Sequence, residues 1–282
     1  MRRWSCGARG GEPAGGGTAG GMVDLRNLPK GNANSESGPV TLALDRFTIG
    51  EKLWLQDMRG SFEGGKVRQG SFSGRINGGA TVSGRVTPSP QGPAIQITSA
   101  DAGAAVKSVG ILPSASGGVL QIDLQPTGAA GTYDGRLAIS DISVYQAPVM
   151  AEILSGLSIV GMLEQMAGEG IKFAEVDADF RLDPEQLVLR SSSAVGASMG
   201  LSLGGYYALS SQQLNMQGVF SPLYIINAVG QILTRKGEGL FGMTFTVKGT
   251  TAAPSVSVNP LTLLAPGPLR EIFRSRPPQA GQ

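Results

Sequence analysis

The stretch GSFSGRINGGATVSGRV, residues 70–86, decides the fold, because it holds two alternating apolar runs joined by a turn signal. The alternating small or apolar positions are Phe72, Gly74 and Ile76 before the turn, and Ala80, Val82, Gly84 and Val86 after it. Asn-Gly between two such runs is the strongest short-range signal for a β-hairpin. The stretch therefore predicts two antiparallel strands with one apolar face.

The same alternation extends along most of the chain. It begins with Val40, Leu42 and Leu44 and ends with Val256 and Val258. Serine, threonine, glutamine and arginine fill most positions between the apolar ones, so one face of the sheet is expected to be apolar and the other solvated. We expect a mainly β fold, an elongated, twisted antiparallel sheet curled into a groove, with two apolar helices and one or two short helices.

Composition excludes several classes of function. The 43 glycines among 282 residues show no three-residue period, which excludes collagen and favours a β protein rich in turns. A net charge of +2 with 6% aromatic residues offers no basic stripe with stacking rings, so no nucleic acid partner is expected. The chain has no histidine, which removes the commonest general base and the commonest zinc ligand.

Motifs that resemble catalytic or nucleotide-binding signatures fail in context. GSFEGGK, residues 60–66, has the spacing of a phosphate-binding loop, but Val67 replaces the required Ser or Thr. GLSLG, residues 200–204, has the form of a nucleophile elbow around Ser202, but the chain has no histidine to activate the serine. We therefore expect no enzyme activity, no catalytic or metal site, and no cofactor.

The chain divides into three parts by composition. Residues 1–37 are expected to be a disordered Gly-rich leader, because they offer little apolar surface to bury. The leader carries two arginines without a following apolar stretch, so no signal peptide is readable. Residues 38–276 are expected to form one β domain, and residues 277–282 a disordered tail.

Three segments depart from the alternation. Ala105, Val106, Val109 and Ile111 suit a short helix that ends before Pro113. Residues 148–167 and 222–237 each place apolar residues three and four positions apart, which predicts two apolar helices. A helix lying on the apolar face of the sheet explains residues 148–167 better than a membrane span, because glycines, serines and two glutamates interrupt the stretch.

The C-terminal stretch PLREIF has one apolar side beside arginines. Two interpretations stay open: this end contacts a membrane or an envelope partner protein, or it covers the edge of the sheet. A large apolar face with few helices to cover it suggests a groove for lipid chains. The candidate lipid-groove or membrane-contact residues are Val149, Ile153, Leu157, Val160, Leu163, Ile225, Ile226, Val229, Leu233, Leu269, Ile272 and Phe273.

Several of these stretches carry a resemblance. The segments SADAGAAVKSVGILPSASGGVLQIDLQ, APVMAEILSGLS, GIKFAEVDADFRL and GEGLFGMTFTVKGTTAAPSVSVNPLTLLAPGPLREIF resemble the C-terminal region of the AsmA-like proteins, in the YhdP-type branch with a DUF3971-like segment. The resemblance covers about residues 40–275, and VNPLTLLAPGPLREIF is its most specific part.

The resemblance implies a periplasmic β-groove of Gram-negative bacteria, associated with the inner membrane through an N-terminal helix. In such a protein the groove carries phospholipid between the inner and outer membranes, without enzyme chemistry. No anchor helix is readable in this chain, which suggests a truncated copy. The alternative is a structural or adhesive β-rich envelope protein without a ligand, and a membrane β-barrel is third because aromatic girdles are lacking.

Overall fold

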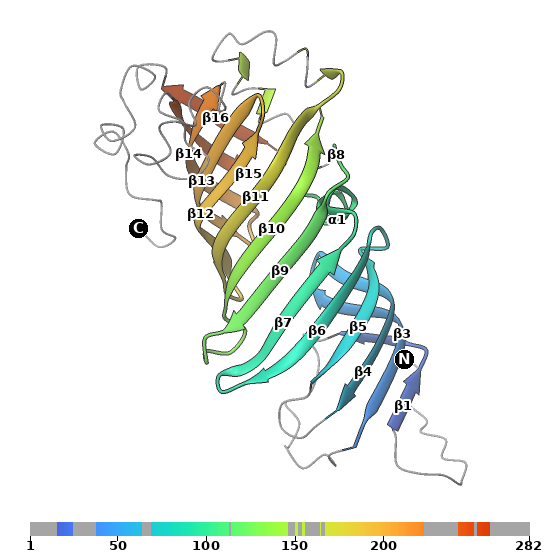
Figure 1. Ribbon diagram of the computed structural model, residues 1–282. Coiled ribbons are helices and arrows are strands. Elements are labelled where there is room, and N and C mark those ends of the chain that lie inside the picture. Colours follow the sequence, from blue (N-terminus) through green and yellow to red (C-terminus); the bar gives the residue numbers. More distant parts are fainter. Residues whose placement is uncertain are drawn as a thin grey trace.

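The computed structural model describes residues 16–24, 38–63, 69–112, 114–145, 150–151, 154–155, 164, 167–222, 242–250 and 253–259. These residues form sixteen strands in a single sheet, together with the helix α1 (Figure 1). The prediction of a mainly β protein is confirmed.

The strands follow one another along the chain. The first half contains β1 (Gly16–Ala19), β2 (Met22–Asp24), β3 (Val40–Gly50), β4 (Leu53–Glu63), β5 (Gln69–Ile76), β6 (Thr81–Ser89), β7 (Gly92–Ser99), α1 (Ala102–Ser108) and β8 (Ala115–Ser116). The second half contains β9 (Val119–Pro126), β10 (Tyr133–Val144), β11 (Ile171–Leu182), β12 (Gln186–Gly196), β13 (Met199–Ala208), β14 (Gln213–Pro222), β15 (Met243–Thr250) and β16 (Pro254–Asn259).

Most strands that follow one another in the sequence are neighbours in the sheet. The order is β1-β3-β4-β5-β6-β7-β9-β10-β11-β12-β13-β14-β15-β16, with β2 beside β3 and β8 beside β10. From β3 to β16 every pairing along this order is antiparallel, and β1 and β2 add a parallel edge to β3. The sheet is therefore open and mixed rather than purely antiparallel.

The parallel edge comes from residues 16–24, inside the stretch that we expected to be disordered. Gly16 lies opposite Val40, and Met22 lies opposite Arg46. Strand pairing uses backbone groups, so a segment of glycine and small residues can join an edge without burying large side chains. The rest of the predicted leader, residues 1–15 and 25–37, lies outside the described residues.

The turn that joins β5 to β6 is the hairpin predicted from Asn-Gly. Asn77 and Gly78 have positive φ values of 49° and 74°, and the Gly79 amide donates to the Ile76 carbonyl at 2.9 Å. Positive φ at both central positions is what a type I′ turn requires, and its twist matches that of the strands.

Helix α1 lies where a short helix was predicted, but it ends earlier. It begins after Asp101, whose carboxylate accepts from the Ala104 amide at 2.9 Å, and its last residue is Ser108. Gly110 has a positive φ of 77°, and Ile111 is 69% exposed. The left-handed glycine ends the helix, so Val109 is its C-cap residue and Ile111 lies beyond it.

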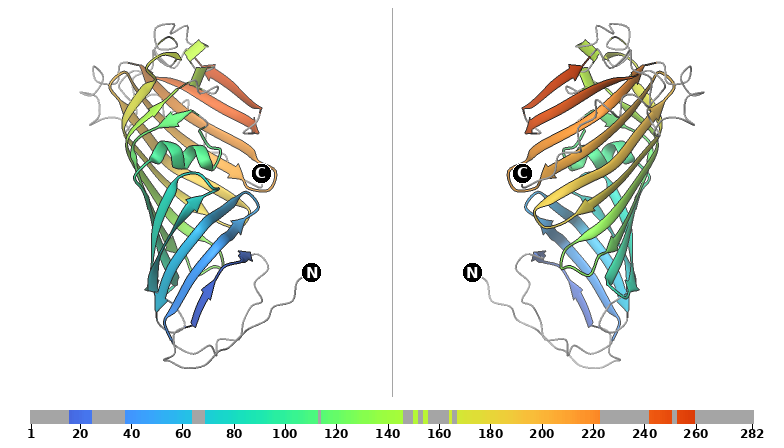
Figure 2. Two further views of the ribbon diagram at one scale, coloured as in Figure 1. Left: turned by 90° about the vertical axis from the view of Figure 1, so that its right-hand side faces the viewer. Right: turned by 90° about the vertical axis from the view of Figure 1, so that its left-hand side faces the viewer.

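The sheet curves toward the side on which α1 lies (Figure 2). Gly103 allows α1 to lie close to β8, because a Cβ at residue 103 would collide with the backbone of Ser116. The buried side chains of α1, Ala102, Ala105 and Val106, pack into the same cluster as Leu120 and Ile139 of the sheet. Helix α1 therefore covers part of the apolar face.

Most residues of the two predicted apolar helices lie outside the described residues. Within 148–167, Met150, Ala151 and Leu154 are described with helical backbone, and Leu154 is fully buried. Met150 and Ala151 pack against the cluster that contains Leu154. For 222–237 only Pro222, the last residue of β14, is described.

Candidate functional site

One face of the sheet carries a continuous row of apolar residues and glycine from β3 to β16. A single row of directly opposed residues crosses thirteen strands and holds only apolar residues and glycine. In sheet order the row is Val40, Phe62, Gly70, Val86, Ile95, Leu124, Gly135, Phe180, Leu189, Gly205, Met216, Val247 and Val256. Since opposed residues share a face, we call this the apolar row.

Phenylalanine and glycine alternate across neighbouring strands on this face. Phe180 lies opposite Gly135, and a Cβ at Gly135 would collide with the Phe180 ring. The pairs Phe62–Gly70, Phe72–Gly84 and Phe245–Gly218 have the same arrangement. In each of these four Phe–Gly pairs the ring lies over the neighbouring strand, which the missing side chain permits.

The buried residues on this face form two clusters rather than one. The smaller cluster is built around Leu44, Leu55, Met58 and Val82 at the β3–β6 end. The larger one holds the α1 side chains and extends from β9 to β15. The apolar face therefore holds two buried clusters, which meet at the opposed residues Ile97 and Ile122.

Three half-buried residues of the apolar row that lie side by side on β6, β7 and β9 belong to neither cluster. They are Val86 of β6, Ile95 of β7 and Leu124 of β9, which lie directly opposite one another. We call these three residues the central apolar patch. Partly exposed aliphatic side chains side by side on a curved sheet form a surface that apolar groups can contact.

The opposite face of the sheet is polar. One of its rows runs Thr41, Ser61, Ser71, Arg85, Gln96, Asp123, Arg136, Asp179 and Ser191. The carboxylate of Asp134 accepts from Arg181 at 3.0 Å and from Arg190 at 2.6 Å, and the Arg181 hydrogen bond holds its pKa below the usual value. Charged side chains thus keep this face in water.

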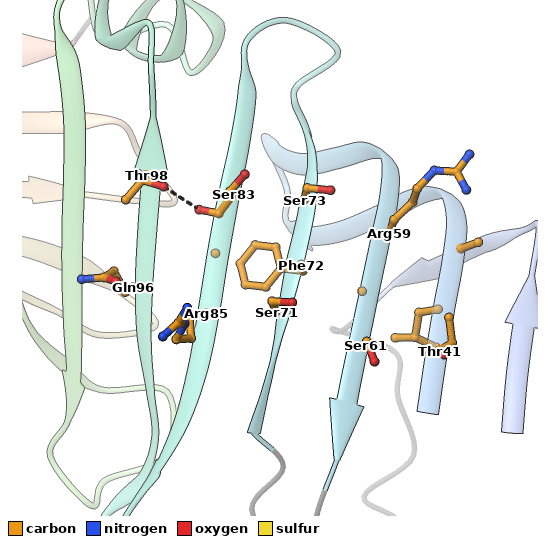
Figure 3. A pocket seen from close by; sticks show the side chains of 14 residues that line it. Thr41, Arg59, Ser61, Ser71, Phe72, Ser73, Ser83, Arg85, Gln96 and Thr98 are labelled. Carbon is orange, nitrogen blue, oxygen red and sulfur yellow. Dashed lines mark hydrogen bonds between the residues drawn. The ribbon is translucent and has the colours of Figure 1, made fainter. Parts of the chain in front are cut away.

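A hollow of about 630 Å³ lies on the polar face over β3–β7 (Figure 3). Its side chains include Arg59, Arg85 and Gln96 together with serines and threonines. Four apolar-face positions, Leu42, Gly60, Phe72 and Gly84, also border it. This hollow and the central apolar patch therefore lie on opposite faces of the sheet and share β6 and β7.

Comparisons of the chain with protein-family models, with curated proteins and with solved structures gave no match. Among the described residues, no helix has the length and apolar character needed to cross a bilayer. Within those same residues, no three His, Cys, Asp or Glu side chains gather where a metal ion would bind. The assignment of function therefore rests on the two faces of the sheet.

The structure does not describe any of the site residues predicted from sequence. These are Val149, Ile153, Leu157, Val160, Leu163, Ile225, Ile226, Val229, Leu233, Leu269, Ile272 and Phe273. The central apolar patch was missed as a site, because its residues have the same alternation as fully buried strand residues. The signal that predicts the strands was present, but it does not say which apolar residues stay partly exposed.

Proposed function

We propose that this protein holds phospholipid acyl chains along the apolar face of its sheet and serves lipid transfer between membranes. The observation that carries the proposal is the apolar row, which is continuous over thirteen strands and half-buried at Val86, Ile95 and Leu124. The curved sheet with α1 on its inner side suits a groove for such chains (Figure 2). A phospholipid has an apolar part long enough to use an extended face.

The dimensions and energies fit an acyl chain. Twelve strand spacings of about 4.8 Å give the row a length of roughly 58 Å. The hydrocarbon core of a bilayer is about 30 Å thick, so one face has room for more than one acyl chain end to end. Each buried CH₂ group contributes about 0.8 kcal/mol, and eight of them about 6 kcal/mol.

The setting of this activity follows from the resemblance to AsmA-like proteins, and membership of that family stays a prediction. On this proposal the protein acts in the periplasm of a Gram-negative cell, in association with the inner membrane, and phospholipid passes toward the outer membrane. A membrane or envelope partner at the C-terminal end belongs to the same proposal. No enzyme chemistry is part of it.

A photo-crosslinking experiment tests the proposal at the central apolar patch. A photoreactive amino acid is placed at Ile95 or Leu124 in the full chain, and the protein is irradiated after incubation with phosphatidylethanolamine vesicles. The matched control carries the same amino acid at Gln125, the residue after Leu124 in β9 and therefore on the polar face. We expect phospholipid adducts, detected by mass spectrometry, at Ile95 and Leu124.

Equal labelling on the two faces would show contact with lipid without a defined groove. Absence of adducts at Ile95 and Leu124, together with lipid-free protein in native mass spectrometry, would reject lipid binding. A structural or adhesive β protein without a ligand would then explain the sheet.

A further inference from the structure

The hollow on the polar face has a charge that is unlike the rest of that face. Its fourteen lining residues include the two arginines Arg59 and Arg85 and no carboxylate. The side chains come from five consecutive strands, β3 to β7 (Figure 3). Its volume of about 630 Å³ lies within the usual range of roughly 300–1,000 Å³ for small-molecule sites.

The other arginines on the described strands are engaged. Arg75 pairs with Asp57, Arg136 with Asp179, and both Arg181 and Arg190 with Asp134. Arg46 lies over the ring of Trp54, with 4.3 Å between the guanidinium carbon and the ring centroid. Arg59 and Arg85 are exposed, and neither forms an ion pair with an acidic residue in the part of the chain that the structure describes.

Hydroxyl groups occupy the positions around the two arginines. Arg59 lies in a row with Ser73, Ser83 and Thr98. The Thr98 hydroxyl donates to the Ser83 carbonyl at 3.5 Å. Arg85 lies in the adjacent row, between Ser71 and Gln96. Two strand spacings and two residues of rise place the Cα atoms of Arg59 and Arg85 about 12 Å apart.

Carboxylates near the hollow already have hydrogen-bond donors: Asp57, two residues from Arg59 in β4, accepts from Arg75 at 2.8 Å. Asp123 lies opposite Gln96 and accepts from the Gln96 amide at 2.9 Å and from the Gln121 amide at 2.7 Å. Arg85 lies two strands away from Asp123, with Gln96 between them. The guanidinium groups of the hollow are therefore available to an anion from outside the sheet.

From this arrangement we infer that the polar hollow binds a phosphorylated saccharide. Arginine is suited to paired hydrogen bonds with phosphate oxygens, and serine and threonine hydroxyls can donate to and accept from sugar hydroxyls. A nucleic acid fits less well, because Phe72, the one aromatic residue bordering the hollow, shares the opposite face with Gly84, leaving no ring for bases to stack on. The site is independent of the proposed acyl-chain face.

Isothermal titration calorimetry of the full chain tests this inference with three soluble probes: glucose bisphosphate, glucose and inorganic phosphate. We expect glucose bisphosphate to bind more tightly than either of the other two, and its affinity to fall as salt is added. R59Q and R85Q should each weaken binding about tenfold or more, since a hydrogen bond to a charged group is lost. The matched control is R136Q, a change on the same face outside the hollow.

A second set of measurements separates a free ligand from a lipid-borne one. Phosphatidylcholine vesicles that contain lipid A present the same chemistry, a saccharide with phosphates, on a membrane, and vesicles of phosphatidylcholine alone are the control. Binding in either the soluble or the vesicle experiment that the R59Q/R85Q double variant abolishes and R136Q retains supports the inference. Equal affinity for inorganic phosphate and glucose bisphosphate, binding unchanged in the double variant, or no binding in both experiments overturns it. Circular dichroism of each variant shows whether it is folded.

Discussion

The four Phe–Gly pairs show how single residues shape the apolar face. A β-sheet normally disfavours glycine, because glycine loses the most backbone entropy and brings no side chain to pack. Here each glycine leaves space that a phenylalanine ring on the neighbouring strand fills, as Phe180 does over Gly135. The rings thus spread laterally over the sheet.

Adding a methyl group under one of these rings should therefore be costly. We expect Gly135→Ala to destabilise the protein by about 1–3 kcal/mol, because the Phe180 ring must move. The matched control is Gly204→Ala in β13, where a Cβ would come no closer than 3.5 Å to the carbonyl oxygen of Leu189. Urea unfolding followed by circular dichroism measures both, and equal midpoints for the two variants would contradict the packing argument.

The ion pairs of Asp134 make a second prediction at this scale. Its folded-state pKa is lowered by the Arg181 hydrogen bond, so its contribution to stability is present above the unfolded pKa of about 3.9 and is lost as pH falls through the folded pKa. We expect Asp134→Asn to lower the urea midpoint at pH 7 and to have little effect at the lowest pH at which the protein stays folded. A midpoint difference that does not change over this range would exclude the linkage.

At the scale of elements, the β5–β6 hairpin is attached to α1 through the side chains of Asn77 and Ser108. The Asn77 amide donates to the carbonyls of Lys52 and Ser108, both at 2.9 Å, and its oxygen accepts from the Trp54 amide at 3.0 Å. Ser108 in turn accepts from the Ala80 amide at 3.1 Å. These bonds hold the C-terminal end of α1 against the tip of the hairpin.

Two substitutions at Asn77 separate the turn from this attachment. Asn77→Gly keeps the positive φ and removes the three side-chain hydrogen bonds, which should cost about 1–3 kcal/mol. Asn77→Ala loses the same bonds and also strains the turn, so it should cost about 1 kcal/mol more. Hydrogen exchange of the α1 amides should speed up in both variants, and unchanged α1 protection would mean that the side chain does not hold the helix.

The strands could be predicted from sequence because alternation is a local signal, and residues such as Val82 and Gly84 carry it within one element. The strand order could be predicted because short turns leave few other arrangements. Strands β1 and β2 were not predicted, because their pairing with β3 depends on backbone groups. The central apolar patch was not predicted from sequence either, since the exposure of Ile95 depends on which distant segments cover the sheet.

At the scale of the whole molecule, the apolar face has two buried clusters and a central apolar patch that belongs to neither. Buried apolar area is the main source of stability, and the half-buried patch is apolar surface that the proposed acyl chain would cover. Occupation by an acyl chain would complete the cover of the face.

This arrangement predicts that delipidated protein binds the dye ANS under native conditions and that phospholipid displaces the dye. Saturating lipid should also raise the unfolding temperature, because a ligand at 100 times its Kd stabilises the native state by about 2.7 kcal/mol. Fluorescence titration and differential scanning calorimetry measure the two effects. Leu124→Asn should weaken both, whereas Gln125→Asn on the polar face should not. Dye binding that phospholipid does not reverse would argue against an acyl-chain site.

From β3 onward, nearly every strand pairs with the strand made just before it. A nascent chain leaving the ribosome can therefore add one strand after another to the growing edge of the sheet, because the partner of each new strand has already been synthesised. Low contact order of this kind speeds folding. Because the strand order is sequential, duplication or loss of a hairpin in the gene would lengthen or shorten the sheet without changing the order of the remaining strands.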